Sequence, residues 1–368
     1  MFDSSTVLMV LLTVVVAAAI AFAATPLVRK LAVKMKVIDV PKDARRVHKK
    51  PIPLMGGLAI ILAFYLCALL LHTFYDKMVI EKPVLGILIG AAIIVVLGIF
   101  DDKYALPALP KFFVQIAAAS IAVGFGCRID VLSNPFSSST LPYWVLPQWL
   151  SISLSIIWIV AITNAVNFID GLDGLAAGIS AISAATMLIV SLLTGEVYIA
   201  LLLAAILGGC LGFLPYNFNP AKIFMGDTGS TFLGFILATF SVQGMFKLYA
   251  VVSFVVPILI LGVPIFDICF AFLRRIAHGQ SPMTPDRGHI HHRLIDLGFS
   301  QRQAVAIAYM MTAILGLTAV VLTYDGEMQA LVMIGAFVLA GGIGIMMIMH
   351  SRFDSQNNKP KDDSDTKE

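Results

Sequence analysis

Residues 6–28 have the sequence TVLMVLLTVVVAAAIAFAATPLV, and Arg29 and Lys30 follow directly. The run contains no charged residue and exceeds the roughly 20 apolar residues that a membrane-spanning helix needs. A cleaved signal peptide would carry a positive charge ahead of the apolar run, whereas the charge found there is Asp3. The stretch therefore predicts a first transmembrane helix that is not cleaved off. The two basic residues mark the end of this helix on the inner side of the membrane.

The composition extends this membrane prediction to the rest of the chain. Hydrophobic residues make up 59% of the 368 residues, charged residues make up 13%, and the mean hydropathy is +0.92. A soluble domain carries roughly 25% charged residues, so this composition excludes a soluble globular protein. The expected fold class is all-α, a polytopic integral membrane protein. We expect about 11 transmembrane helices, placed near 6–28, 53–75, 83–100, 111–127, 149–166, 174–194, 197–214, 229–246, 248–273, 302–323 and 327–349.

These helices form a single expected transmembrane domain over residues 1–350. Residues 351–368 are charged and poor in apolar side chains, so we expect a disordered cytoplasmic tail there. Residues 128–148 contain three prolines and a cluster of Ser and Thr, which predicts a loop or a short hairpin between two helices.

The positive charges indicate the orientation. If the N-terminus is outside, about 21 of the 25 Lys and Arg residues fall in inside segments. Those segments are 29–52, 101–111, 164–173, 215–228, 274–302 and the tail from 351. The remaining basic residues, Lys77, Lys82, Arg128 and Lys247, fall outside. Because cytoplasmic loops are enriched in Lys and Arg, we expect the N-terminus outside and the C-terminus in the cytoplasm.

Two adjacent carboxylates, Asp101 and Asp102, end one expected helix on the inside. Like charges this close repel each other, which raises one pKa or requires a bound cation. Mg²⁺ is the natural candidate, because it takes hard oxygen ligands and bridges phosphates. The alternative interpretation is a solvated helix end. Lys111 opens the next expected helix and by itself would be an ordinary interfacial anchor.

The sequence NAVNFIDGLDG at residues 164–174 supplies two amides and two carboxylates directly after an apolar span. The polar residues recur at every third position, so consecutive ones lie on adjacent parts of a helix surface. We expect the two glycines to break the helix and let Asp170 and Asp173 turn back toward Asn167. Asn side chains suit a sugar hydroxyl, an amide or a metal. The alternative is helix capping and Asp-Gly turn formation.

Another inside segment contains the sequence MGDTGS at residues 225–230, where a further apolar helix begins. Free backbone N–H groups at a helix N-terminus favour phosphate binding. In the simpler interpretation Asp227 only caps this helix. A carboxylate beside a phosphate site is better explained when a metal ion lies between them.

Residues 285–293 have the sequence PDRGHIHHR, which places three histidines and two arginines within seven positions. No cysteine or nearby glutamate completes a zinc ligand set. His and Arg together suit a pyrophosphate or its leaving group better. The basic segment 45–50 contains His48 and Lys49, and its simpler interpretation is inside topology with attraction to anionic lipid.

Four of these motifs, taken in their order along the chain, resemble those of the polyprenyl-phosphate N-acetylhexosamine-1-phosphate transferases. The motifs are Asp101-Asp102, the 164–174 stretch, Gly226 to Ser230 and the run His289-Ile290-His291-His292. The resemblance covers roughly residues 10–350. The His-Ile-His-His form is similar to the WecA/TagO-type branch, which uses UDP-N-acetylglucosamine (UDP-GlcNAc).

The resemblance implies a plasma-membrane enzyme with its catalytic site on the cytoplasmic face and Mg²⁺, or Mn²⁺, as cofactor. A polyprenyl phosphate such as undecaprenyl phosphate would attack the β-phosphorus of UDP-GlcNAc. The products would be polyprenyl-diphospho-N-acetylglucosamine and UMP, and the lipid product would start a cell-surface glycan such as teichoic acid or O-antigen.

The resemblance also implies roles for single residues. Asp101 and Asp102 are the expected catalytic carboxylates, and which of them acts as a base or nucleophile stays open. Asp227, Asn167 and Asp101 are the expected metal ligands. The expected substrate-binding residues are Lys111, Asn164, Asp170, Asp173, Arg287, His289, His291, His292, His48 and Lys49.

Two alternatives remain at this point. The same chemistry could use another nucleotide sugar, such as UDP-GalNAc or UDP-MurNAc-pentapeptide. A different class, an ion-coupled transporter, is raised by ionisable residues near membrane segments. Their expected position at one face, with almost none in mid-span, favours the enzyme. The expected partners are UDP-GlcNAc, the lipid phosphate and the membrane, with no nucleic acid, and a homodimer is left open.

Overall fold

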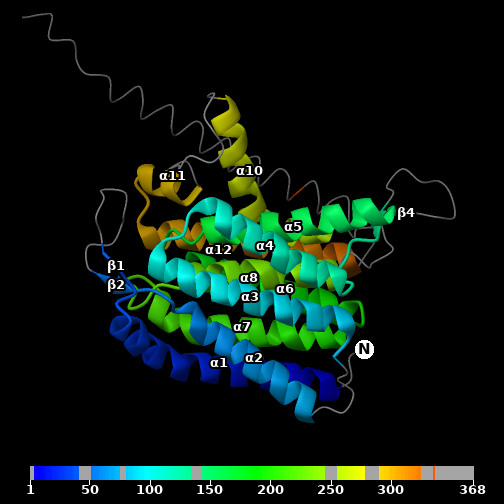
Figure 1. Cartoon of the computed structure of the whole chain (residues 1–368), viewed down its shortest axis with the longest axis horizontal. Coiled ribbons are helices and arrows are strands. Elements are labelled where there is room, and N and C mark those ends of the chain that lie inside the picture. Colours follow the sequence, from blue (N-terminus) through cyan, green and yellow to red (C-terminus); the bar gives the residue numbers. More distant parts are fainter. Residues whose placement is uncertain are drawn as a thin grey trace, which may run out of the picture.

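The computed structural model describes residues 4–40, 51–74, 80–133, 143–244, 255–277, 290–324 and 335. Within these residues the chain forms twelve helices and four short strands (Figure 1). The helices are α1 (Ser4–Lys34), α2 (Gly57–Phe74), α3 (Lys82–Tyr104), α4 (Ala108–Gly124), α5 (Gln148–Phe168), α6 (Leu175–Leu193), α7 (Val197–Asn217), α8 (Gly226–Gly244), α9 (Val255–Ile260), α10 (Gly262–Ala277), α11 (Ile290–Asp296) and α12 (Gln301–Tyr324). The strands are β1 (Ile38–Asp39), β2 (Ile52–Pro53), β3 (Val131–Ser133) and β4 (Tyr143–Val145).

The all-α, multi-pass membrane class predicted from the sequence is confirmed. Among the described residues, seven helices are long and apolar enough to cross a membrane, namely α1, α2, α3, α5, α6, α7 and α12. The span expected at 248–273 is instead two helices, α9 and α10, with Leu261 between them. The short helix α11 was not expected. The last expected span, 327–349, lies almost wholly outside the described residues, so the count of eleven spans stays a prediction.

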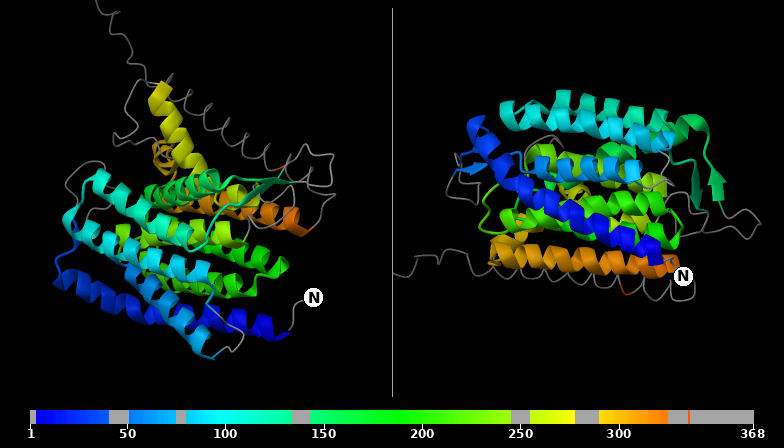
Figure 2. Two further views of the ribbon diagram at one scale, coloured as in Figure 1. Left: turned by 45° about the vertical axis from the view of Figure 1, so that its right-hand side comes forward. Right: turned by 90° about the horizontal axis from the view of Figure 1, so that it is seen from below.

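The long helices run roughly side by side, as Figures 1 and 2 show from three directions. α8 lies in the interior and contacts α2, α3, α5, α6 and α7. Every residue of α8 is buried except Asp227. A helix that is apolar on all sides belongs in the interior of such a bundle. The sole partly exposed position of this central helix is therefore the carboxylate at its N-terminus.

Glycines let three helices meet in backbone contact beside that N-terminus. A Cβ atom placed on Gly57 of α2 would lie 2.1 Å from the Cα of Gly229, and one on Gly98 of α3 would lie 2.3 Å from the Cα of Thr228. Small residues at helix crossings allow such close approach in membrane proteins. The start of α8 is thus held against α2 and α3 with no room for larger side chains.

Two short hairpins connect the helices. β1 pairs antiparallel with β2, with Ile38 opposite Pro53. After β2 the chain bonds to the segment before α8, because the Gly56 N–H donates to the Phe224 carbonyl (2.8 Å) and the Phe224 N–H donates to the Pro53 carbonyl (2.9 Å). β3 pairs antiparallel with β4, which confirms a hairpin within 128–148. α10 projects away from the bundle (Figures 1 and 2).

Candidate active site

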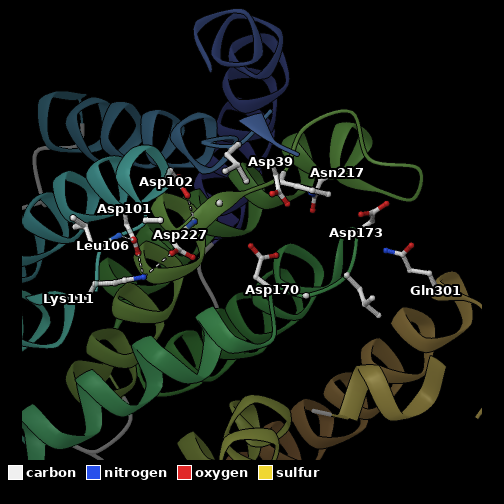
Figure 3. A pocket seen from close by; sticks show the side chains of 16 residues that line it. Asp39, Asp101, Asp102, Leu106, Lys111, Asp170, Asp173, Asn217, Asp227 and Gln301 are labelled. Atoms are coloured by element: carbon white, nitrogen blue, oxygen red, sulfur yellow. Dashed lines mark hydrogen bonds and ion pairs between the residues drawn. The ribbon is translucent and has the colours of Figure 1, made fainter. Parts of the chain in front are cut away.

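A cavity of about 540 Å³ lies at the end of the bundle where α3 and α5 end and where α4 and α8 begin. Figure 3 shows side chains from these separate elements around one common space. Six lining residues are aspartates and one is a lysine, namely Asp39, Asp101, Asp102, Asp170, Asp173, Asp227 and Lys111. Six carboxylates against one ammonium make this wall strongly acidic, and such a cluster needs protons or a cation to offset the repulsion.

The Asp102 carboxylate caps the N-terminus of α8. It accepts hydrogen bonds from the backbone N–H groups of Asp227 (2.7 Å) and Thr228 (3.2 Å) and from the Thr228 hydroxyl (2.6 Å). Gly226 has φ +75°, and a Cβ atom there would lie 2.5 Å from an Asp102 oxygen. The sequence predicted a phosphate at these N–H groups. The structure places a carboxylate from α3 there instead, which satisfies donors that a helix start leaves free.

Lys111 links two carboxylates that are distant in the sequence. Its Nζ lies 2.5 Å from an Asp101 oxygen and 3.5 Å from an Asp227 oxygen. The other Asp101 oxygen accepts the Leu106 N–H at 2.9 Å, in the turn between α3 and α4. Asp101 therefore both shapes this turn and orients the lysine that follows it.

Asn167 holds Asp227 from the opposite side. Its Nδ2 donates to the Asp227 Oδ1 (2.9 Å) and to the Ser230 hydroxyl (2.8 Å). The simpler interpretation, in which Asp227 only caps its own helix, is not what the structure shows, since its two oxygens face Asn167 and Lys111. Both hydrogen bonds come from the Asn167 amide nitrogen, and within the described residues its side-chain carbonyl accepts none. Asn167 does not itself line the cavity but holds Asp227, which does.

Asn164 lies one turn deeper in α5 and pairs with Gln115 of α4. Its Nδ2 donates to the Gln115 Oε1 (2.7 Å) and to the Val160 carbonyl (2.8 Å), and the Gln115 Nε2 donates back at 3.4 Å. Asn164 does not line the cavity. This geometry favours positioning over the substrate contact expected for Asn164, because Gln115 stands one turn from Lys111.

Asp173 faces the loop between α7 and α8 rather than Asn167. One of its oxygens accepts the Asn219 amide (2.9 Å) and the Ala221 N–H (3.0 Å). The expected helix break is confirmed, since α5 ends at Phe168 and Gly174 has φ +80°. The expected turn of Asp173 back toward Asn167 is wrong, because Asp173 instead satisfies donors of that neighbouring loop.

The Asp173–Asn219 bond also sets the orientation of Gln301, at the start of α12. A carboxylate only accepts, so the Asn219 Nδ2 must donate to it, and the same nitrogen donates to the Gln301 Oε1 at 2.6 Å. The Gln301 Nε2 is then the end presented toward the cavity, which Gln301 lines (Figure 3). Arg302 fixes this arrangement by donating from Nη2 to the Asn219 carbonyl at 2.8 Å.

The Asp170 carboxylate accepts no hydrogen bond within the described residues, unlike the carboxylates of Asp101, Asp102, Asp173 and Asp227. It lies half-buried on the cavity wall, and Figure 3 shows its carboxylate pointing into the open space. Burial, together with the negative charges of Asp227, Asp102 and Asp173, raises its pKa to about 8. A carboxylate with neither donors nor a counter-charge is the group in this wall that gains most from a cation.

The donor set fits a hard divalent cation chemically. Carboxylate and amide oxygens are the ligands that Mg²⁺ prefers, and Asp170, Asp227 and Asn167 supply them. Among the described residues, no three acidic, histidine or cysteine side chains already stand as a ligand cluster. The Lys111 ammonium lies between Asp101 and Asp227 and supplies the positive charge there.

Several predicted site residues lie beyond this geometry. His48, Lys49, Arg287 and His289 fall outside the described residues, and of His291 and His292 only the backbone, in the first turn of α11, is described. Their substrate roles stay predictions. Asp39, Gln115, Asn217 and Gln301 were missed. Of these, only Gln115 had a local signal, because it follows Lys111 by one helical turn.

Comparisons with known proteins identify the family of the chain. The family model described as glycosyl transferase family 4 matches residues 84–245, which include the ends of α3, α4, α5 and α8 that form the cavity. Together with the relatives described next, this match shows that the chain is a membrane enzyme of the sugar-phosphate transferase class.

A probable undecaprenyl-phosphate N-acetylglucosaminyl 1-phosphate transferase of Bacillus subtilis (strain 168) is 43% identical over 298 residues, which cover 81% of this chain and 80% of the relative. A decaprenyl-phosphate N-acetylglucosaminephosphotransferase of Mycobacterium leprae (strain TN) is 37% identical over 360 residues, covering 91% and 89%. An undecaprenyl-phosphate alpha-N-acetylglucosaminyl 1-phosphate transferase of Salmonella typhi is 29% identical over 320 residues, covering 85% and 84%. The chain belongs to this family of polyprenyl-phosphate N-acetylglucosaminyl 1-phosphate transferases, which confirms the resemblance and decides against the transporter.

Proposed function

We propose that the protein transfers N-acetylglucosamine 1-phosphate from UDP-GlcNAc to a polyprenyl phosphate, such as undecaprenyl phosphate, and releases UMP. An oxygen of the lipid phosphate forms a bond to the β-phosphorus, and the bond from that phosphorus to the UMP oxygen breaks. The lipid product would start a cell-surface glycan. The observation that carries the proposal is the cavity wall of six aspartates and one lysine at the helix ends.

The acidic wall can hold a cation between two anionic substrates. A lipid phosphate and a diphosphate repel each other, and an acidic wall alone would repel both. A divalent cation offsets this repulsion and stabilises charge on the transferred phosphoryl group when it is bound. We assign Asp227, Asp170 and the Asn167 carbonyl to hold Mg²⁺ or Mn²⁺. Asp101, also expected as a ligand, orients Lys111 in the structure.

We assign Lys111 to bind the lipid phosphate. It stands in the first turns of α4, where Leu109, Phe112 and Phe113 are 61%, 46% and 65% exposed. An exposed apolar surface beside a cation suits a lipid that carries its phosphate at the membrane boundary. The lipid phosphate is already ionised near neutral pH, so the reaction needs alignment of the reacting groups more than a strong base.

Direct attack by the lipid phosphate is the step we favour over a covalent enzyme intermediate. Both oxygens of Asp102 accept hydrogen bonds at the start of α8. Both oxygens of Asp101 are also engaged, one by Leu106 and one by Lys111. A carboxylate oxygen that already accepts strong hydrogen bonds is a weakened nucleophile, so these residues position groups rather than attack.

We place this site on the cytoplasmic face of the plasma membrane. The support is the excess of Lys and Arg in the segments at the same end of the helices, since such segments stay in the cytoplasm. UDP-sugars are made in the cytoplasm, which agrees with a cavity open at that end.

The test is UMP release by purified protein in detergent, with undecaprenyl phosphate and a set of UDP-sugars. We expect turnover with UDP-GlcNAc, slower turnover with UDP-GalNAc and UDP-MurNAc-pentapeptide, and loss of turnover in excess chelator that Mg²⁺ restores. Glu196→Gln, in the turn between α6 and α7 at the other end of the bundle, is the matched acidic control and should keep full activity. Full turnover in chelator would contradict the metal assignment.

A further inference from the structure

A second cavity, of about 470 Å³, lies beside the last turns of α1. Pro26, Arg29, Lys30 and Val33 of α1 line it together with two residues from the other side, Tyr216 and Lys222. It shares no lining residue with the acidic cavity. We call it the basic groove, because three of its six lining residues are cations.

The cations of the basic groove have no acidic partner among the described residues. Neither Arg29, Lys30 nor Lys222 takes part in an ion pair there. The Lys222 Nζ instead lies over the Tyr216 ring, 5.8 Å from the ring centroid. The backbone N–H of Lys222 donates to the Tyr216 carbonyl at 2.8 Å. Three unpaired cations around apolar walls leave positive charge that an anion can neutralise.

The groove lies at the depth of lipid head groups. α1 has 31 residues, and Arg29 follows the helix start by about 38 Å at 1.5 Å per residue. The hydrocarbon core is about 30 Å thick and the whole bilayer about 40–45 Å. Apolar side chains of α1 directly before the groove face outward, since Phe22 is 51% and Leu27 is 66% exposed. An acyl chain can follow this surface away from the cations.

We propose that the basic groove binds one anionic glycerophospholipid. Its phosphodiester would lie among Arg29, Lys30 and Lys222, and its acyl chains would lie along the outer face of α1. Arg and Lys near a membrane surface attract anionic lipid by an amount that corresponds to about fivefold in affinity per charge.

The occupant differs from the acceptor lipid of the reaction. The acceptor must reach Lys111 and Asp227, which belong to the other cavity. Lys222 stands in the loop between α7 and α8, and that loop leads to Asp227. A lipid that holds Lys222 would therefore also hold the segment before α8, so we expect bound lipid to raise the melting temperature.

The test measures lipid binding and needs no enzymatic activity, so its outcome is independent of the proposed function. The full-length protein is placed in nanodiscs of phosphatidylcholine with increasing phosphatidylglycerol. Bound phosphatidylglycerol is counted by native mass spectrometry, and the melting temperature is followed in parallel. The double variant Arg29→Gln/Lys222→Gln should bind phosphatidylglycerol about 30-fold more weakly, because two charges are lost.

The matched control is Lys34→Gln/Lys36→Gln, which removes the same charge near the end of α1 but outside the groove. It should weaken binding less than about threefold. Arg29→Lys/Lys222→Arg keeps both charges and should retain binding, which separates loss of charge from damage to the fold. Equal weakening in the groove and control variants would overturn the proposal in favour of diffuse attraction. Binding of undecaprenyl phosphate but not phosphatidylglycerol would overturn it in favour of a second acceptor site.

Discussion

Asp102 and Asp170 line the same cavity, but their carboxylates differ in the hydrogen bonds that they accept. Asp102 accepts three hydrogen bonds from the start of α8. Asp170 lies in the loop after α5. Within the described residues its carboxylate accepts no hydrogen bond, and its pKa is raised to about 8. The difference separates a carboxylate that builds the site from one that is available to a ligand. Residue type and position at a helix end do not distinguish the two roles, whereas the set of donors around each carboxylate does.

The largest expected effect comes from Asp170→Asn. The substitution removes a negative charge that we assign to the cation while removing no recorded hydrogen bond. We expect turnover to fall by about 10²–10³-fold, in the range seen when one electrostatic contact to a transition state is lost. The melting temperature of the metal-free protein should not fall. UMP release and thermal unfolding measure the two quantities, and a large drop in melting temperature with normal turnover would reverse the assignment.

Asp102→Asn should show the opposite pattern. An amide has one acceptor oxygen where the carboxylate has two, and its NH₂ group would face the N–H donors of α8. We expect a loss of about 1–3 kcal/mol in stability, which is the cost of leaving buried donors unsatisfied, together with reduced turnover as Asp227 shifts. Thr228→Val removes only the hydroxyl donor and should cost less. An Asp102→Asn protein as stable as wild type would show that the cap does not hold α8.

Parts of this site could be predicted from the sequence. The long apolar runs identified most of the helices, and charged and amide residues at their ends indicated a common acidic site with Lys111. Which aspartates build the site and which are available to a ligand could not be predicted, because this depends on contacts between segments that are distant in the sequence. The bond from Asp102 to Asp227 spans 125 positions and that from Asp173 to Asn219 spans 46. Nor does a local pattern show that Asp173 would turn toward the α7–α8 loop.

Gly98→Ala tests the other support of the α8 start. The new methyl group would lie 2.3 Å from the Thr228 Cα, and a backbone atom cannot move aside as a side-chain end can. We expect a loss of about 1–3 kcal/mol in stability, as for other overpacked positions. Gly124→Ala in α4 is the control, because no atom lies within 4 Å of a Cβ there. Equal melting temperatures for the two variants would argue against backbone contact between α3 and α8.

The raised pKa of Asp170 predicts a pH effect on stability. The native state holds a proton on Asp170 up to about pH 8, whereas an unfolded aspartate loses it near pH 4. Between these values the native state binds more protons, so the stability of metal-free protein falls as pH rises. Mg²⁺ competes with that proton, and the melting-temperature gain from Mg²⁺ should grow with pH toward about 8. Asp170→Asn should weaken this pH dependence.

The smallest effect on activity is expected from a substitution of Gln301, which lines the other side of the cavity. Gln301→Ala removes the amide that the Asp173–Asn219 bond orients. If this amide donates to the nucleotide sugar, the KM for UDP-GlcNAc should rise about fivefold, corresponding to one neutral hydrogen bond, with kcat nearly unchanged. Steady-state kinetics with UMP as a competing ligand show which part of the substrate is contacted. An unchanged KM would remove Gln301 from the site.

Direct titration of Mn²⁺ into the purified chain, followed by electron paramagnetic resonance, addresses the central claim that the carboxylates of Asp170 and Asp227 hold a divalent cation. We expect one Mn²⁺ site in the wild-type protein, from which Mg²⁺ displaces the Mn²⁺. Mn²⁺ should bind much more weakly to Asp227→Asn and Asp170→Asn, and with unchanged affinity to Glu196→Gln. Equal Mn²⁺ affinity in the wild-type protein and both aspartate variants would contradict this claim.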